Sequence, residues 1–266
     1  MSDTRRLLSY IRRAVDDYEM IAEGDRIAVG ISGGKDSLSL LTALAQLRKF
    51  YPKHFEIMGI SIDMGLPDMD FSPVADYCRE LDVEYRIIPT DISNIIFNIR
   101  RESNPCSLCA KMRRGALNKA AAELGCNKVA LGHHFDDVVE TFMLNLFFEG
   151  RIGVFRPVTF LSRTGVTVIR PMIYMPEKDV RYFASHAGLP VVTSTCPADK
   201  HTEREEMKQL LARLDREHKG LRYRIFGAIQ RGGVDGFREF SRMAGIKAYG
   251  DGDDEADETE NDNEEE

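Results

Sequence analysis

The chain has 266 residues, of which 43% are hydrophobic and 30% charged, a composition typical of a packed soluble core in one or two domains. No stretch approaches the ~18 consecutive apolar residues that a membrane-spanning helix needs, so the sequence predicts no such helix. The charged N-terminus resembles no secretory signal, and five cysteines are an odd number for a disulfide framework. We therefore expect a cytoplasmic protein whose cysteines are thiols, metal ligands or redox groups.

The negative charge is concentrated at the C-terminus. Residues 251–266 hold 11 acidic residues and no base, so without them the formal net charge of −7 becomes +4 for residues 1–250. Such a block buries too little apolar surface to fold, and we expect a disordered acidic tail. The body is only mildly basic, but arginine and lysine groups at residues 12–13, 113–114 and 204–231 could form a stripe that contacts RNA phosphates.

Helices and strands are predicted to alternate along the chain. Apolar residues at helical spacing predict an N-terminal helix over residues 5–22, ended by Gly24. Short apolar runs predict strands over residues 26–31, 56–62, 84–88, 127–131, 166–169 and 189–192. Further helices are predicted over residues 38–48, 74–81 and 136–148, and over the basic stretch 202–231. This alternation predicts an α/β fold with a doubly wound parallel sheet, in which ligands bind at the carboxyl ends of the strands.

A glycine-containing loop between the first strand and its helix is the strongest functional motif. In the loop SGGKDS, two glycines let backbone N–H groups form an anion nest at a helix N-terminus. The spacing is neither that of a Walker A loop nor that of a GxGxxG turn. The alternative is a simple turn. The residues expected to bind nucleotide are Ile31, Ser32, Gly33, Gly34, Lys35, Asp36 and Ser37, with Asp36 also able to cap the helix or hold Mg²⁺.

Three cysteines form a second candidate site. Cys106 and Cys109 make a CxxC pair beside basic residues, and Cys196 lies far downstream after an apolar run. Three thiolates could hold a four-iron cluster with one open iron, a zinc ion with a further ligand, or a redox-active disulfide with persulfide chemistry. Cys78 and Cys126 are expected to be buried small hydrophobic residues.

Further polar residues follow other predicted strands, at the edge of the sheet formed by the carboxyl ends of the strands. Gly132 would let the backbone approach a nucleotide, and Asp137 could bind Mg²⁺ or activate the substrate; the alternative is that Asp136 caps the helix. The adjacent histidines of this GHHFDD segment should point apart and share no metal. Asp63, at the end of the second strand, could contact the ribose or a metal. Arg113 could clamp phosphates, or lie on a solvated helix face.

The loop SGGKDS resembles the PP-loop of the N-type ATP pyrophosphatases, which implies adenylation of a substrate oxygen with release of pyrophosphate. SGGKDS, CSLCAKMRRGAL, ALGHHFDDVVETFMLNLFFEG, VIRPMIYMPEKDV and Cys196, in this order, resemble the tRNA 2-thiocytidine synthetase family over roughly residues 8–231. The resemblance implies a PP-loop ATPase domain over residues 24–200, between an N-terminal helix (1–23) and a helical extension (201–245), with the tail at 246–266.

The same resemblance implies a function. ATP, Mg²⁺ and a 4Fe-4S cluster on Cys106, Cys109 and Cys196 would convert the cytidine at tRNA position 32 to 2-thiocytidine, with catalytic roles for Lys35, Arg113 and Asp137. The expected partners are tRNA and a sulfur donor, either a cysteine desulfurase or free sulfide, and a homodimer is one compatible assembly. The alternatives are a sulfurtransferase or desulfidase acting on a small molecule or another tRNA base, and a non-catalytic nucleotide or cluster sensor.

Overall fold

One sheet organises the molecule. The computed structural model describes residues 3–67, 69–100, 105–192, 196 and 203–240. The strands are β1 (Asp25–Gly30), β2 (Phe55–Asp63), β3 (Glu84–Pro89), β4 (Lys128–Ala130), β5 (Val158–Leu161) and β6 (Val166–Ile169). They lie in the order β3-β2-β1-β4-β6-β5, and every neighbouring pair is parallel except β5 and β6. The predicted doubly wound α/β fold is confirmed.

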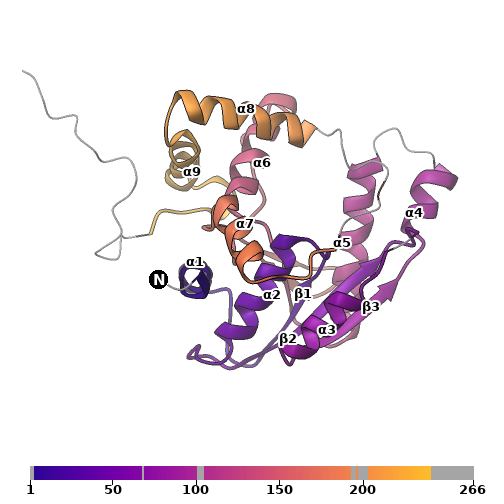
Figure 1. Cartoon of the computed structure of the whole chain (residues 1–266). Helices are drawn as coiled ribbons and strands as arrows, with labels where there is room; N and C mark the ends of the chain where they lie inside the picture. Colours follow the sequence, from indigo (N-terminus) through magenta and orange to yellow (C-terminus); the bar gives the residue numbers. More distant parts are fainter. Residues whose placement is uncertain (1–2, 68, 101–104, 193–195, 197–202, 241–266) are drawn as a thin grey trace, which may run out of the picture.

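Helices cover both faces of this sheet (Figure 1). The helices are α1 (Asp3–Asp17), α2 (Lys35–Leu47), α3 (Ser72–Glu80), α4 (Ile92–Asn94, continued by a π-helix over Ile95–Arg100), α5 (Pro105–Glu123), α6 (Phe135–Phe148), α7 (Glu177–His186), α8 (Glu203–Glu217) and α9 (Leu221–Arg231). No helix in the described residues is both long enough and apolar enough to span a bilayer.

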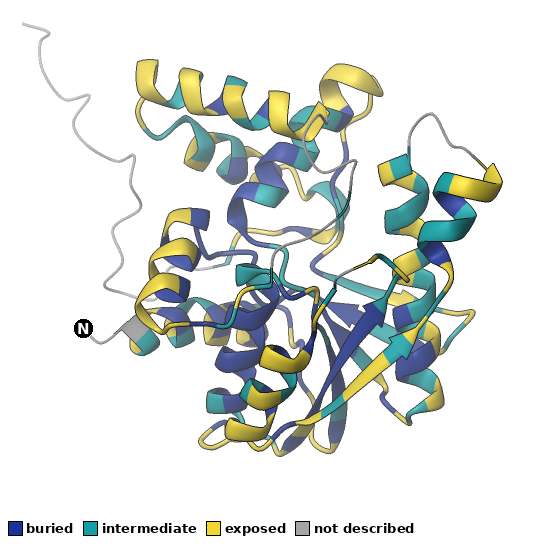
Figure 2. Cartoon of the chain, turned by 45° about the vertical axis from the view of Figure 1, so that its right-hand side comes forward, coloured by how far each residue is buried: buried dark blue, intermediate teal, exposed yellow. Residues whose placement is uncertain are grey.

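Alternation along β1 divides the core in two. Ile27 and Val29 pack with α1, α2, α6 and α7, whereas Ala28 packs with α4 and α5 on the other face. Successive side chains of a strand point to opposite faces, so one strand serves both cores. The central strands are almost wholly buried, and the edge strand β3 is largely exposed (Figure 2). The C-terminal segment joins the first core through Phe237, which is fully buried.

Several predicted boundaries were wrong for local backbone reasons. The N-terminal helix ends at Asp17, before the predicted residue 22, because Glu19 has a left-handed backbone with φ of 48°. The predicted helix over residues 202–231 is two helices, divided at Gly220, whose φ is 78°. Residues 189–192 form no strand, since the Val192 N–H donates to the Gly33 carbonyl at 2.9 Å and not to a sheet neighbour.

One strand escaped prediction. β5 pairs with β6 as an antiparallel hairpin closed by a turn with Gly165 at φ of 72°. Its residues, VTFL, are few and exposed or half-buried, so their apolar pattern is weak. The acidic tail lies outside the described residues.

Candidate functional site

The loop between β1 and α2 is held in shape by its own serines. The Ser37 hydroxyl donates to the Gly34 carbonyl at 2.9 Å and accepts from the Ser32 N–H at 3.2 Å. The Ser32 hydroxyl accepts from the Gly34 N–H at 3.3 Å, and Gly34 is the N-cap of α2. Ile31 anchors the loop, since it is buried and its N–H donates to Ile60 on β2 at 2.8 Å. The result is a preformed cradle at a helix N-terminus, where an anion is favoured.

Two other segments close on this loop. Gly33 has φ of 83°, a conformation that favours glycine, and a Cβ there would lie 3.0 Å from the Cβ of Val192. A Cβ on Gly132 would meet the backbone C and O of Asp36 at 3.0 Å and the Ser37 nitrogen at 3.2 Å. Gly132 therefore allows close approach between the segment after β4 and the start of α2, and its predicted contact with a nucleotide stays a prediction.

Lys35 is oriented by two carboxylates. Its Nζ lies 3.0 Å from Asp36 and 3.3 Å from Glu177, the first residue of α7. Burial lowers the pKa of Lys35, but the charges of these carboxylates outweigh it and the pKa is raised overall. Glu177 also contacts Lys208 at 2.8 Å and Arg181 at 3.1 Å. These cations hold the pKa of Glu177 at about 2 against the opposing effect of burial. The lysine of the loop is thus charged and tied to α7 and α8.

The start of α6 excludes the alternative interpretation, in which Asp136 caps the helix. His134 is the N-cap: its ring accepts from the Asp137 N–H at 3.4 Å, and the Asp137 carboxylate accepts from the His134 N–H at 2.9 Å. Asp136 instead bonds Arg222 of α9 at 2.6 Å and accepts from the Glu177 N–H at 2.6 Å. The two histidines have separate surroundings, as predicted, because the His133 ring packs on Phe155 at 4.8 Å.

Two of the three candidate cysteines lie on α5, and the third, Cys196, interacts electrostatically with one of them. Cys106 and Cys109 lie in the first turn of α5, and the Cys109 thiol donates to the Met64 sulfur at 3.4 Å. Burial raises the pKa of Cys109, Arg113 lowers it, and the charges of Cys196 and Cys106 raise it again. Cys109 therefore lies within electrostatic reach of both other thiols.

A metal site is not fully assembled in the part of the chain that the structure describes, where no group of three or more His, Cys, Asp or Glu side chains could hold a metal ion. Residues on both sides of Cys196 lie outside that part. The donor set is nevertheless chemically suited to a cluster, because all three side chains are thiols and a cation stands beside them. Cys78 and Cys126 are buried as predicted, and burial raises the pKa of Cys78 to about 11.

Two other predicted site residues lie outside the loop. Arg113 is exposed on α5 and acts on the Cys109 thiol, which places it with the cysteines. Asp63 ends β2, and its carboxylate accepts from the Gly65 N–H at 2.9 Å. Neither is shown in contact with the loop, and their roles in nucleotide binding stay predictions.

Sequence reasoning missed two acidic residues near the site. Glu177 lies in the segment MPEKDV that carried the family resemblance, and a proline before it was a usable sign of a helix start. Glu140, one turn beyond Asp137, is buried, which raises its pKa to about 7, helped by the Asp137 charge. A lone glutamate on a helix gives no sequence signal of burial.

Comparison with known proteins identifies the family to which this chain belongs. A family model described as a PP-loop domain matches residues 5–214. The tRNA-cytidine(32) 2-sulfurtransferase of Pelobacter propionicus is 42% identical over 228 residues, covering 85% of each chain. That of Geotalea uraniireducens is 42% identical over 216 residues, 80% of this chain and 86% of the relative. This chain belongs to the tRNA-cytidine(32) 2-sulfurtransferase family of PP-loop proteins. The predicted family resemblance is confirmed.

A solved structure supports the membership at the level of the fold. The U34-tRNA thiolase NcsA from Methanococcus maripaludis, determined with its [4Fe-4S] cluster, superposes with a TM-score of 0.72 at 26% identity. The match covers 86% of this chain and 78% of that one. The shared fold thus includes a tRNA thiolase that carries a [4Fe-4S] cluster.

Proposed function

We propose that this member of the family uses ATP to activate the cytidine at position 32 of a tRNA and replaces its 2-oxygen with sulfur. One observation carries the proposal: Cys109, on α5 with Cys106, lies within electrostatic reach of Cys196, which follows by four positions the Val192 that meets Gly33 of the PP-loop. Nucleotide and sulfur chemistry would thus meet at one edge of the sheet. The division into N-terminal helix, PP-loop domain and helical extension remains part of the proposal.

In the first step the base oxygen O2 attacks the α-phosphorus of ATP, a P–O bond forms, and the bond to the departing pyrophosphate breaks. The backbone N–H groups of the loop and the Lys35 ammonium would stabilise the charge that develops on the phosphates, which is the main catalytic contribution in such transfers. Asp36 and Asp137 are the carboxylates proposed to hold Mg²⁺ or orient the base, and Arg113 would neutralise phosphate charge. Asp63, Gly132 and the serines would line the nucleotide.

The cluster fits the three thiols described above. Cys106, Cys109 and Cys196 would hold a 4Fe-4S cluster, which would bind sulfide from the external donor and present it for transfer. In the second step a C–S bond forms at C2 of the base and the C–O bond to AMP breaks, so AMP leaves with the former base oxygen. Arg113, beside Cys109, would favour the thiolate form of the ligands.

Cytidine 32 is preferred over another base because the relatives near 40% identity, over 80–85% of this chain, are named for it. The solved thiolase named for uridine 34 is only 26% identical. We further propose a cytoplasmic location, where tRNA is available, and either free sulfide or a cysteine desulfurase as the sulfur donor.

The test combines metal analysis with turnover. Anaerobically purified protein should hold about four irons per chain and form 2-thiocytidine and AMP only with ATP, sulfide and unmodified tRNA present. Cys106→Ala should lose iron and thiolation, whereas the matched Cys126→Ala, which removes a buried cysteine outside the group, should keep both.

Lys35→Ala should keep its iron and lower turnover by about 10²–10³-fold. Zinc in place of iron after anaerobic reconstitution would refute the proposed 4Fe-4S cluster. AMP formation that does not depend on tRNA would refute the proposal that tRNA is the substrate.

A further inference from the structure

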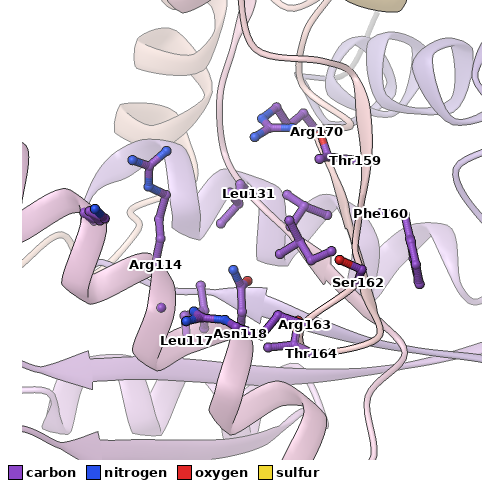
Figure 3. Close-up of a pocket in the computed structure, with 14 residues that line it drawn as sticks. Arg114, Leu117, Asn118, Leu131, Thr159, Phe160, Ser162, Arg163, Thr164 and Arg170 are labelled. Atoms are coloured by element: carbon purple, nitrogen blue, oxygen red, sulfur yellow. Dashed lines mark hydrogen bonds between the residues drawn. The ribbon is translucent and has the colours of Figure 1, made fainter.

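A cavity lies between α5 and the β5–β6 hairpin, beside Leu131, which follows β4. It has a volume of about 470 Å³, large enough for a nucleotide, opens to solvent, and is lined by α5, Leu131 and the β5–β6 hairpin. Figure 3 shows Arg114 on α5 and Arg170 at the end of β6 on opposite sides of it, with Leu131 between them. None of the roles proposed above uses this cavity.

The lining is strongly basic. Four cations line the cavity, namely Lys111, Arg114, Arg163 and Arg170, and its fourteen lining residues include no aspartate or glutamate. Among the described residues, no carboxylate forms an ion pair with any of the four. Elsewhere on this chain arginines are commonly paired, as Arg222 is with Asp136. An unneutralised group of four cations in a concave site favours an anion.

Arg170 gives this site a fixed donor. It is 8% exposed, its guanidinium lies over the Phe155 ring at 5.0 Å, and it donates to the Arg156 carbonyl. Its Nε is buried and has no hydrogen-bond partner in the described part of the chain. Burial and the Arg114 charge lower the pKa of Arg170 to about 10. Arg170 is one of the lining residues, so its guanidinium is placed to donate to an anion bound in the cavity.

The cavity adjoins the proposed reaction edge without being part of it. Leu131 lines the cavity, and the next residue, Gly132, packs on the PP-loop at Asp36. Helix α5 links it to the cysteines, since Arg114 follows Cys109 by five positions on the same helix. An extended polyanion whose reacting base lay at the PP-loop could therefore place a neighbouring group here.

We infer that this cavity binds a backbone phosphate of the tRNA next to the target nucleotide. The inference rests on the proposed function and names the groups that position its substrate. Lys111, Arg114 and Arg163 are exposed and would meet the incoming backbone, and Arg170 would donate from the buried end. The hydroxyls of Thr159 and Ser162, on the hairpin, add donors suited to a phosphodiester.

The experiment removes two exposed cations, so that folding is spared. Arg114→Gln/Arg163→Gln is compared with Arg79→Gln/Lys119→Gln, which removes the same charge from exposed positions outside the cavity. Binding of unmodified tRNA is measured by fluorescence anisotropy from 50 to about 300 mM salt, with ATP binding measured alongside. The cavity variant should bind tRNA about tenfold or more weakly, with a salt slope reduced by about two, and should bind ATP like the wild type.

The possible results separate the two proposals. If the cavity variant and the control bind tRNA equally and share one salt slope, the phosphate site is refuted while tRNA thiolation stands. If tRNA binding is unchanged but inhibition by inorganic pyrophosphate weakens, the cavity holds the leaving group and the inference is overturned in favour of that anion. If the wild type neither binds nor thiolates tRNA, the proposed function itself fails.

Discussion

Gly132→Ala tests whether the PP-loop depends on close approach of the loop that follows β4. The added methyl group would meet the backbone of Asp36 at 3.0 Å and the Ser37 nitrogen at 3.2 Å, and these atoms begin α2. Backbone cannot rotate away as a flexible side chain can, so the two segments must separate by a few tenths of an ångström. Overpacking of this kind costs about 1–3 kcal/mol.

The cost should appear in both stability and nucleotide binding. At ~2–4 °C per kcal/mol for a chain of this size, Tm should fall by roughly 2–12 °C. Because the displaced atoms are those of the anion cradle, we expect ATP affinity, measured by calorimetry, to fall about tenfold, equivalent to about 1.4 kcal/mol.

Gly227→Ala is the matched control. A Cβ at this position on α9 meets only the far end of the Arg231 side chain, at 2.9 Å, and that side chain can move. Alanine is the better helix former by about 1 kcal/mol, so this variant should be as stable as the wild type or more so, with normal ATP binding. Wild-type Tm and ATP affinity in Gly132→Ala would refute the reasoning from close approach.

Two further predictions concern the buried charges behind the site. Arg222→Met removes the cation paired with Asp136 and one of the two arginines paired with Glu140, and should lower the free energy of unfolding in urea by about 3–5 kcal/mol; exposed Arg216→Met should change it little. An equal loss in both variants would show that the ion pair is not the cause. Burial raises the pKa of Glu140 to about 7 from 4.5, so between these pH values the folded state holds a proton that the unfolded state has lost. Stability should therefore fall as pH rises through that window, by up to about 3 kcal/mol, and Glu140→Gln should abolish the trend.

Short-range features of the sequence determined the fold class and the nucleotide loop. Apolar runs of the length of a strand, separated by helical periodicity, were enough to predict β1, β2, β3, β4 and β6. The serines and glycines of the PP-loop bond mainly to one another, within six consecutive residues. The position at which α6 begins was predictable for the same reason, but the capping residues were not. His134 and Asp137 form the cap, whereas Asp136 accepts a hydrogen bond from the distant Arg222.

Only the tertiary structure decided which distant groups meet. Residues 189–192 look like a strand, but the Val192 N–H donates to the Gly33 carbonyl, 159 positions away in the sequence. Glu177 reaches Lys35 across 142 positions of sequence. The basic cavity combines α5 with a hairpin whose first strand had no clear pattern. The periodicity of apolar residues shows which face of a helix or strand is buried. Which helices and strands then contact one another depends on how those buried faces pack in three dimensions.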